Sequence, residues 1–109
     1  MQVLHYSVGE YLPHFDYFDP ALPGSQPVLA QGGQRIMTFI VYLNTVEAGG
    51  ETLFPALDLK VQPKQGRVVM FDNVSNGKID PLSLHASAPV LVGEKWAMTR
   101  WIRERRWGS

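Results

Sequence analysis

The sequence predicts an all-β fold, with a double-sheet jelly roll as the preferred architecture. Short runs of β-forming residues alternate with Gly, Pro and Asn, and the pattern contains neither a long amphipathic helix nor an internal repeat. Roughly seven or eight short strands with few helices are typical of a sandwich or barrel, and two sheets closed around a cavity would let residues from distant strands meet inside. A chain of 109 residues is expected to form a single domain over residues 1–109, with one core.

The first half of the chain is predicted to contain two extended segments, a long loop and the strongest strand. Residues 2–8 are rich in β-formers, a turn is expected at residues 9–10, and residues 11–16 follow as a further extended segment. Residues 17–34 contain several prolines and glycines and predict a long loop, which in a compact domain is usually functional or mobile. Residues 35–44 are apolar on both faces, which predicts a strand buried at the centre of a sheet.

The second half is predicted to be a series of short strands that ends in a hairpin. A turn at 48–50 precedes strands at 51–54, 59–62 and 67–71 and a polar loop at 73–81. Residues 84–90 and 94–103 are predicted to pair as a hairpin, with its turn near Val92 and Gly93. Alternate residues of the last strand point to opposite faces, Trp96, Met98, Arg100 and Ile102 to one and Lys95, Ala97, Thr99 and Trp101 to the other.

Composition and charge narrow the classes of function. Lys plus Arg and Asp plus Glu each number 10, so the formal net charge is zero, and neither nucleic acid nor a membrane is an expected partner. The basic residues near the C-terminus are interpreted as a charged, solvated tail. The absence of cysteine excludes disulfides, zinc–thiolate sites and cysteine nucleophiles. With no apolar run near the roughly 20 residues of a transmembrane helix and no signal-peptide pattern, a cytoplasmic location is the default expectation.

His14 and Asp16 form the first part of a candidate metal site. Residues two apart in a strand point to the same face, so this pair can hold one ion from one side. His85, one of three histidines, lies in an apolar strand far downstream and would add a second imidazole. Two imidazoles and one carboxylate leave open coordination positions, which suits iron(II), whereas structural zinc is closed off and usually bound by cysteine. The alternatives are a surface histidine beside a turn aspartate, and a buried, hydrogen-bonded histidine.

Lys95 adds a candidate site for an anion. It lies across the predicted hairpin from His85, and a lysine on an inward strand face is costly to bury without an anion. A carboxylate of a ligand in the cavity would satisfy it, and the hydroxyls of Tyr6, Tyr42 and Thr52 could donate to the same carboxylate. The alternatives are an outward lysine at the end of a hairpin, and hydroxyl-bearing residues that only pack.

Four segments of the chain resemble the prolyl 4-hydroxylase branch of the iron(II)- and 2-oxoglutarate-dependent dioxygenases. They are HYSVGEYLPHFDYF, GGQRIMTFIVYLNTVEAGGETLFP, VQPKQGRVVMF and LHASAPVLVGEKWAMTRWI, which occur in family order over nearly the whole chain. The resemblance implies a double-stranded β-helix in which His14, Asp16 and His85 hold the metal. It also implies that Lys95 pairs with the far carboxylate of 2-oxoglutarate, and that further residues surround the cosubstrate. These are Tyr6, Tyr42 and Thr52, which would line its pocket, and Trp101, an aromatic residue beside the site.

The family chemistry implies an enzyme that uses iron(II) and 2-oxoglutarate, with ascorbate as a further cofactor that the resemblance allows. It releases succinate and carbon dioxide and hydroxylates a substrate, here a proline in a peptide or protein partner. Residues 17–34 would cover the mouth of the site and help set specificity. One alternative is a related oxygenase that acts on another side chain or on a small molecule. Another is a non-catalytic binding module that retains the fold; a plain interaction protein would leave the order of the motifs unexplained.

Relative to the family, the chain begins at the first core strand, so we expect a domain shortened at its N-terminus. The first strand would then present an unpaired sheet edge, with Val3 and Leu4 on a surface left without cover. Pairing two identical edges satisfies the backbone without any new sequence. We therefore expect a homo-oligomer formed through this strand.

Overall fold

The computed structural model describes residues 2–6, by their backbone, and residues 13–104. The turn predicted at residues 9–10, and the basic residues at 105 and 106, lie outside the described residues. The elements in chain order are β1 (Gln2–Tyr6), η1 (Pro23–Ser25), α1 (Gln26–Gly32), β2 (Arg35–Tyr42), β3 (Ala48–Gly49), β4 (Thr52–Phe54), η2 (Pro55–Leu57), β5 (Leu59–Val61), β6 (Val68–Asp72), β7 (Val74–Ser75), β8 (Lys78–Ile79), η3 (Pro81–Ser83), β9 (Ala86–Ser87), β10 (Val90–Val92) and β11 (Lys95–Arg103).

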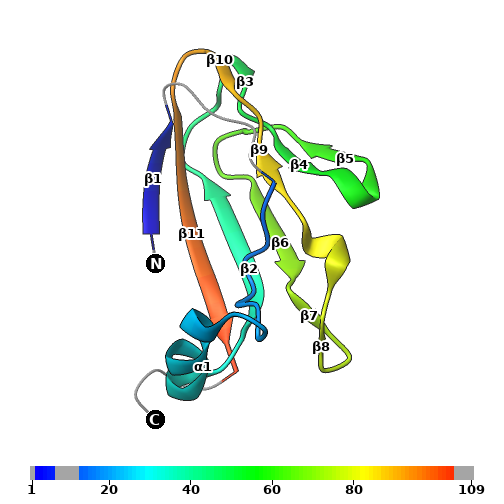
Figure 1. The fold of residues 1–109 in the computed structure, drawn as a ribbon. Helices are drawn as coiled ribbons and strands as arrows, with labels where there is room; N and C mark the ends of the chain where they lie inside the picture. The colour runs from blue at the N-terminus through cyan, green and yellow to red at the C-terminus, as the bar shows by residue number, and fades with distance from the viewer. Residues whose placement is uncertain (1, 7–12, 105–109) are drawn as a thin grey trace.

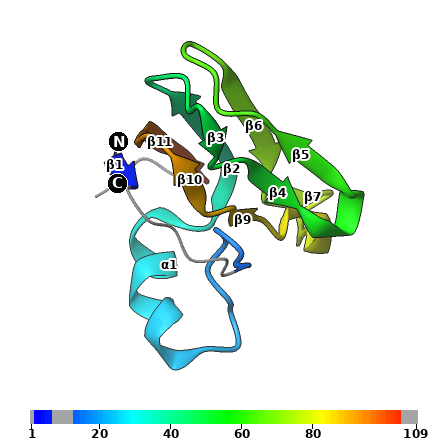
Figure 2. The same ribbon diagram turned by 90° about the horizontal axis from the view of Figure 1, so that it is seen from above.

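Two layers of antiparallel strands form the jelly roll that the sequence predicts. The larger is a four-stranded sheet in the order β1-β11-β2-β6, in which β2 is central, as its apolar sequence predicts. The strands β5-β4-β9 and the pair β10-β3 form smaller sheets. Figure 1 shows β1, β11, β2 and β6 side by side, with β4 and β5 at the upper right, and Figure 2 shows α1 standing apart from the strands.

The core lies on the inner face of the long sheet. Its buried cluster is formed by Tyr42, Phe54, Val69 and Ala97, with Ile40, Val61 and Phe71 packed against it. The predicted alternation of β11 is confirmed, since Lys95, Ala97 and Thr99 are buried and Trp96, Arg100 and Ile102 are exposed. Polar side chains therefore share the inner face with the apolar cluster, and this mixture is what makes a site possible.

The predicted hairpin of residues 84–90 and 94–103 is wrong. β9 pairs with β4, and β10 pairs with β3, whereas β11 pairs with β1 and β2. The predicted turn at 48–50 is instead partly strand, since Gly49 pairs with Val90 of β10; only glycine fits this position (φ +81°), because a side chain would collide with the carbonyl oxygen of Pro89. Local sequence marks strands and turns but not which strand is the partner, since that choice depends on packing between sheets.

Two of the predicted loops contain regular structure. Residues 17–34 include η1 and α1. Pro23 is the first residue of η1, and Pro27 is the second residue of α1. Proline is favoured in the first turn of a helix, because a backbone N–H at that position would have no partner within the helix. The prolines that predict a loop here therefore stand at the starts of two helices. Residues 73–81 contain the hairpin β7-β8, whose turn residues Asn76 and Gly77 both have positive φ, as a type I′ turn requires.

α1 is fastened to the end of β11 by one side chain. Arg103 donates from Nη2 to the carbonyl oxygens of Val28 and Gly33, at 2.7 Å in each case. Phe18 and Gln34 are also joined by two hydrogen bonds of 2.6 and 2.7 Å, so both ends of the 17–34 segment are tied down. Within residues 2–6 and 13–104, no helix has the length and apolar character needed to cross a bilayer.

Self-association is expected at β1, which is an edge strand of the long sheet. Its outer backbone edge has no strand partner among the described residues, and an unpaired edge can accept a second copy. Sedimentation velocity across micromolar concentrations should therefore show a concentration-dependent dimer.

A charge on the edge tests the route of that association. Val3→Lys should shift the chain toward monomer, because two copies would bring like charges together. Met70→Lys places the same charge on β6, at the opposite edge, and should leave the dimer unchanged. A wild-type chain that stays monomeric at every concentration would contradict the expectation.

Candidate functional site

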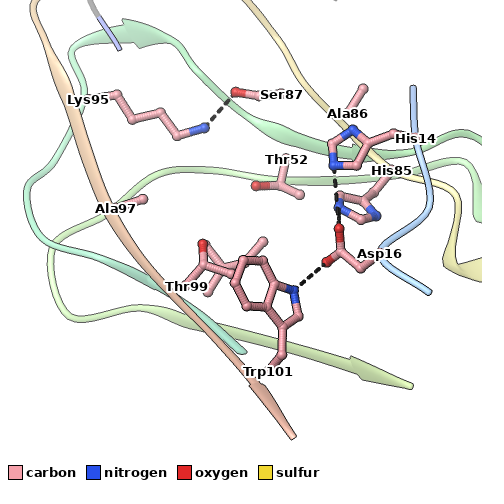
Figure 3. A pocket seen from close by; sticks show the side chains of 11 residues that line it. His14, Asp16, Thr52, His85, Ala86, Ser87, Lys95, Ala97, Thr99 and Trp101 are labelled. Atoms are coloured by element: carbon pink, nitrogen blue, oxygen red, sulfur yellow. Dashed lines mark hydrogen bonds and ion pairs between the residues drawn. The ribbon is translucent and has the colours of Figure 1, made fainter. Parts of the chain in front are cut away.

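A cavity of about 210 Å³ lies between the long sheet and the β5-β4-β9 sheet. It is smaller than the roughly 300–1,000 Å³ typical of sites for drug-sized ligands, so it suits a small metabolite rather than a peptide. Figure 3 shows the polar side chains gathered at its two ends. The lining residues are His14, Asp16, Ile40, Thr52, His85, Ala86, Ser87, Lys95, Ala97, Thr99 and Trp101.

Backbone pairing brings the two histidines together from distant parts of the chain. His14 and His85 form an isolated antiparallel bridge, with N–H···O=C bonds of 2.8 and 3.0 Å in the two directions. Their ring centroids are 4.4 Å apart. The extended segment predicted at residues 11–16 forms no regular strand over its described part, residues 13–16, where a single bridge forms; the side chains of His14 and Asp16 nevertheless meet on one side.

The orientation of the His85 ring is fixed by its neighbours. Its Nδ1 lies 2.8 Å from the carbonyl oxygen of Ser83, and its ring packs 4.8 Å from that of Phe71. A carbonyl oxygen can only accept, so Nδ1 carries the hydrogen. In the neutral ring the lone pair of Nε2 then points toward Asp16, whose Oδ1 is 3.4 Å away.

The two oxygens of Asp16 have different surroundings. Oδ1 faces Nε2 of His14 at 3.5 Å and Nε2 of His85 at 3.4 Å. Oδ2 accepts hydrogen bonds from the Thr38 hydroxyl at 2.8 Å and from the Trp101 indole N–H at 3.2 Å. Burial alone would raise the pKa of Asp16, but when the imidazoles are protonated, hydrogen bonds from His14 and His85 and the charge of His85, together with the Thr38 bond, hold it well below its usual range. The carboxyl group is therefore anionic.

The chemistry of these three side chains fits a metal ion. One ligand atom from each of His14, Asp16 and His85 lies within 4.8 Å of the others. Lone pairs on two imidazole nitrogens and one carboxylate oxygen converge there, and a cation between them relieves their mutual repulsion. Three protein ligands on one side, with the cavity on the other, are typical of open transition-metal sites rather than of closed structural zinc.

Lys95 lies at the other end of the cavity, beside hydroxyl groups (Figure 3). Its Nζ donates to Ser87 Oγ at 2.7 Å, and only 3% of the residue is exposed. Burial lowers the pKa of Lys95 to about 8, although Glu51 opposes the shift. Thr52 lies opposite Ser87 in the pairing of β4 with β9, and its hydroxyl is bonded to that of Tyr42.

The structure brings most of the predicted site residues together. His14, Asp16, Thr52, His85, Lys95 and Trp101 line one cavity. Tyr42 lies behind Thr52 in the buried cluster, and burial raises its pKa, so its hydroxyl keeps its hydrogen. Tyr6 pairs with Lys95 through the backbone of β1, while its side chain lies outside what the structure describes.

Sequence reasoning missed several residues of the site. Thr99 lies on the same face of β11 as Lys95, so strand alternation could have identified it. Thr38 precedes Tyr42 by four positions on β2 and shares its inward face, which is a similar signal. Ser87 follows His85 by two positions in the same extended run, so alternation could also have identified it, whereas Asn73 carries no such signal because it contacts the site from a loop that local patterns do not specify.

These observations define a jelly roll with an open metal site and a lysine at the far end of the same cavity. The chain belongs to the 2OG-Fe(II) oxygenase superfamily, whose sequence model matches residues 1–103. The resemblance identified from the four sequence segments is thereby confirmed.

Within that superfamily, the relatives are prolyl hydroxylases. The chain is 41% identical to "Probable prolyl 4-hydroxylase 6" of Arabidopsis thaliana, over 100% of this chain and 43% of the relative. It is 41% identical to prolyl 4-hydroxylase subunit alpha-1 of Homo sapiens, over 96% of this chain and 20% of the relative. The viral collagen prolyl hydroxylase of Paramecium Bursaria Chlorella virus-1, solved as a 2OG complex, matches 95% of this chain and 57% of its own at 36% identity and a TM-score of 0.77. The chain thus spans less than half of these two curated relatives.

The first test of the site is its metal content. The wild-type chain is expected to bind one divalent ion of the first transition row, and a purified sample can carry manganese, nickel, cobalt or zinc because site affinity does not favour iron. His14→Ala and His85→Ala should each lose stoichiometric binding in elemental analysis. His5→Ala, which removes the third histidine, in β1, should retain it. Unchanged metal content in His85→Ala would rule out this ligand set.

Proposed function

We propose that this chain is the catalytic core of an iron(II)- and 2-oxoglutarate-dependent dioxygenase that hydroxylates a proline within a peptide. One observation carries the proposal. A three-ligand metal site and a buried lysine occupy opposite ends of a single small cavity. The names of the relatives, which are prolyl 4-hydroxylases, support the choice of substrate.

The proposal assigns a role to each end of the cavity. His14, Asp16 and His85 hold iron(II), and Lys95 binds the far carboxylate of 2-oxoglutarate. With oxygen, the bound iron and 2-oxoglutarate supply the oxidising chemistry, which releases succinate and carbon dioxide and hydroxylates the substrate. The protein contributes fixed geometry and a partly closed cavity that limits the access of water.

The hydroxyl groups complete the carboxylate site in this proposal. Thr52 and Ser87 lie opposite each other on paired strands, so they border the Lys95 ammonium together. The Tyr42 hydroxyl forms a hydrogen bond with the Thr52 hydroxyl and so orients it. Trp101 keeps its indole N–H on Asp16 and forms the wall beside the metal. Tyr6 and an ascorbate cofactor remain further elements of the proposal.

A peptide substrate would approach from outside, because the cavity is too small to hold one. The side chain of His14 is 57% exposed, so the metal end of the cavity opens toward solvent. The rings of Phe15 and Tyr17, which are adjacent in sequence to His14 and Asp16, stack 4.7 Å apart, and in this proposal they are candidates to pack against a proline ring. In the 17–34 segment, both ends are tied down, so any closure over the substrate belongs to residues 19–25.

Two other functions are separated from the proposal by one assay. A related oxygenase would release succinate with another peptide or a small molecule. A non-catalytic module would bind metal and 2-oxoglutarate without any substrate-dependent succinate. The assay measures succinate with iron(II), 2-oxoglutarate and a panel of proline peptides, against matched peptides in which alanine replaces proline.

Lys95→Met should weaken 2-oxoglutarate binding more than metal binding. A hydrogen bond to a charged group contributes about 1.5–3 kcal/mol, so the dissociation constant should rise about ten- to a hundredfold. Lys78→Met, on the exposed β8, is the matched control and should bind normally. Calorimetry on the manganese-loaded protein measures both ligands, and unaltered affinity in Lys95→Met would place the carboxylate elsewhere.

The pH dependence of 2-oxoglutarate binding provides an independent check. Only the protonated amine attracts a carboxylate, and the pKa of Lys95 in the free protein is about 8. Affinity should therefore be constant below pH 8 and fall as the pH rises above it. The decline should disappear in Lys95→Met, and its persistence there would assign it to another group.

Shortening the 17–34 segment tests its part in substrate binding. Replacing residues 20–25 by a short Gly-Ser linker removes η1 while leaving α1 and the ties at Phe18 and Gln34. Peptide turnover should fall while metal content and 2-oxoglutarate affinity are retained, since those ligands bind deeper. Full turnover by the shortened protein would show that this segment takes no part in binding the peptide.

A further inference from the structure

Behind the metal site, a chain of hydrogen bonds leads from Asp16 into the interior. We infer that Thr38 and Asn73 are positioning residues, which hold Asp16 so that only Oδ1 faces the metal and thereby set the metal affinity. The inference rests on the proposed function, since it requires a metal at His14, Asp16 and His85. It concerns two residues that touch neither the metal nor the cosubstrate.

Thr38 is the direct contact. It lies on the inner face of β2, is fully buried, and its hydroxyl donates to Asp16 Oδ2 at 2.8 Å. The Trp101 indole N–H donates to the same oxygen at 3.2 Å. Two donors on Oδ2 fix the rotation of the carboxylate, because turning it would break both bonds.

Asn73 fixes the direction of the Thr38 hydroxyl. Asn73 is also fully buried, and its Nδ2 donates to Thr38 Oγ1 at 2.8 Å. A threonine hydroxyl has one hydrogen, and an anionic carboxylate can only accept, so that hydrogen is committed to Asp16. The amide must then present its NH₂ group to Thr38, which makes a one-way chain of donors from Asn73 through Thr38 to Asp16.

The backbone around Asn73 keeps the amide in place. Its N–H donates to the carbonyl oxygen of Ile36 at 2.8 Å, and its carbonyl accepts from the N–H of Asp80 at 2.9 Å. These bonds tie the residue between β2 and the β7-β8 hairpin. The side chain therefore reaches Thr38 from a backbone that is fixed on both sides.

The second oxygen of the chain of donors, Asn73 Oδ1, indicates which way the amide is held. Asn73 Oδ1 is buried and has no hydrogen-bond partner, and among the described residues it is the single buried side-chain polar atom in that position. Rotating the amide would not resolve this, because the one Thr38 hydrogen would then be required by two acceptors. A buried polar atom without a protein partner calls for an explanation, and here it accompanies the orientation of a candidate metal ligand.

The consequence at the metal is single-oxygen ligation by Asp16. An oxygen that already accepts two hydrogen bonds is a poor second ligand, so Oδ1 alone faces the histidine nitrogens. More coordination positions then remain for the cosubstrate and for oxygen. Partners of this kind typically change metal affinity by about 10–100-fold when they are removed.

The experiment compares substitutions of matched shape at Thr38. Thr38→Val keeps the volume and loses the hydroxyl, and Thr38→Ser loses the methyl group and keeps the hydroxyl. Titration of the metal-free proteins with cobalt(II), followed by visible absorption, should show affinity about 10–100-fold weaker in Thr38→Val and an altered spectrum. Thr38→Ser should retain the affinity and the spectrum within a few-fold.

Asn73 is tested through its dependence on Thr38. Asn73→Leu, which has similar size and no donor, should weaken cobalt binding less than Thr38→Val does. Adding Asn73→Leu to Thr38→Val should change the affinity little further, since Asn73 acts through the missing hydroxyl. Independent, additive losses would overturn the proposed chain of donors.

Thermal unfolding of the metal-free proteins separates positioning from simple packing. Lower melting temperatures with wild-type cobalt affinity and spectrum would overturn the inference, because the residues would then serve only the fold. If Thr38→Val does not fold, Trp101→Phe removes the other donor to Oδ2 and should weaken cobalt binding in the same direction; unchanged binding there overturns the inference. Failure of the wild-type protein itself to bind cobalt would instead remove the proposed function.

Discussion

The site depends on a pair of backbone hydrogen bonds between His14 and His85. They hold two segments together that are distant in the sequence, and each segment carries a metal-site side chain. Because the main chain sets the distance between the histidines, their separation does not rely on flexible side chains. Asp16 follows His14 by one bend of the chain and reaches both imidazoles from there. The remaining structure serves this junction, with Phe71 packing on the His85 ring and Ser83 fixing its tautomer.

A second constraint is that the inner face of the long sheet must be both core and site. Thr38, Lys95 and Thr99 occupy inward positions where apolar side chains would add more stability. Most of the buried polar groups are hydrogen-bonded to one another, as in the bonds from Lys95 to Ser87 and from Thr38 to Asp16. The apolar cluster around Tyr42 and Phe54 adjoins the cavity, since Ala97 and Ile40 belong both to the apolar packing and to the cavity lining.

Sequence reasoning succeeded where the physical signal is local. Alternation along residues 95–101 identified the inward face of β11, and His14, Asp16 and His85, selected because few residue types bind metals in this pattern, do lie together in the structure as a candidate metal site. It failed where the signal is non-local. β10 pairs with β3 and not with β11. This pairing depends on packing between Gly49 and Pro89, which are too far apart in the sequence for a local pattern to relate them. The role inferred for Asn73 could not be predicted from the sequence for the same reason, since it depends on a hydrogen bond to Thr38, which is distant in the sequence.

The charges at the two ends of the cavity explain why the proposed ligands belong together. Without metal, and with both imidazoles neutral, the charges of the anionic Asp16 and the protonated Lys95 sum to zero. A divalent ion outweighs the single carboxylate and leaves one positive charge at that end, while Lys95 keeps another at the far end. A ligand with one carboxylate at each end then matches both charges, and 2-oxoglutarate is such a dianion. Under the proposed function, a bound divalent ion would therefore strengthen the attraction of the cavity for an anionic cosubstrate, because the ion adds positive charge to it.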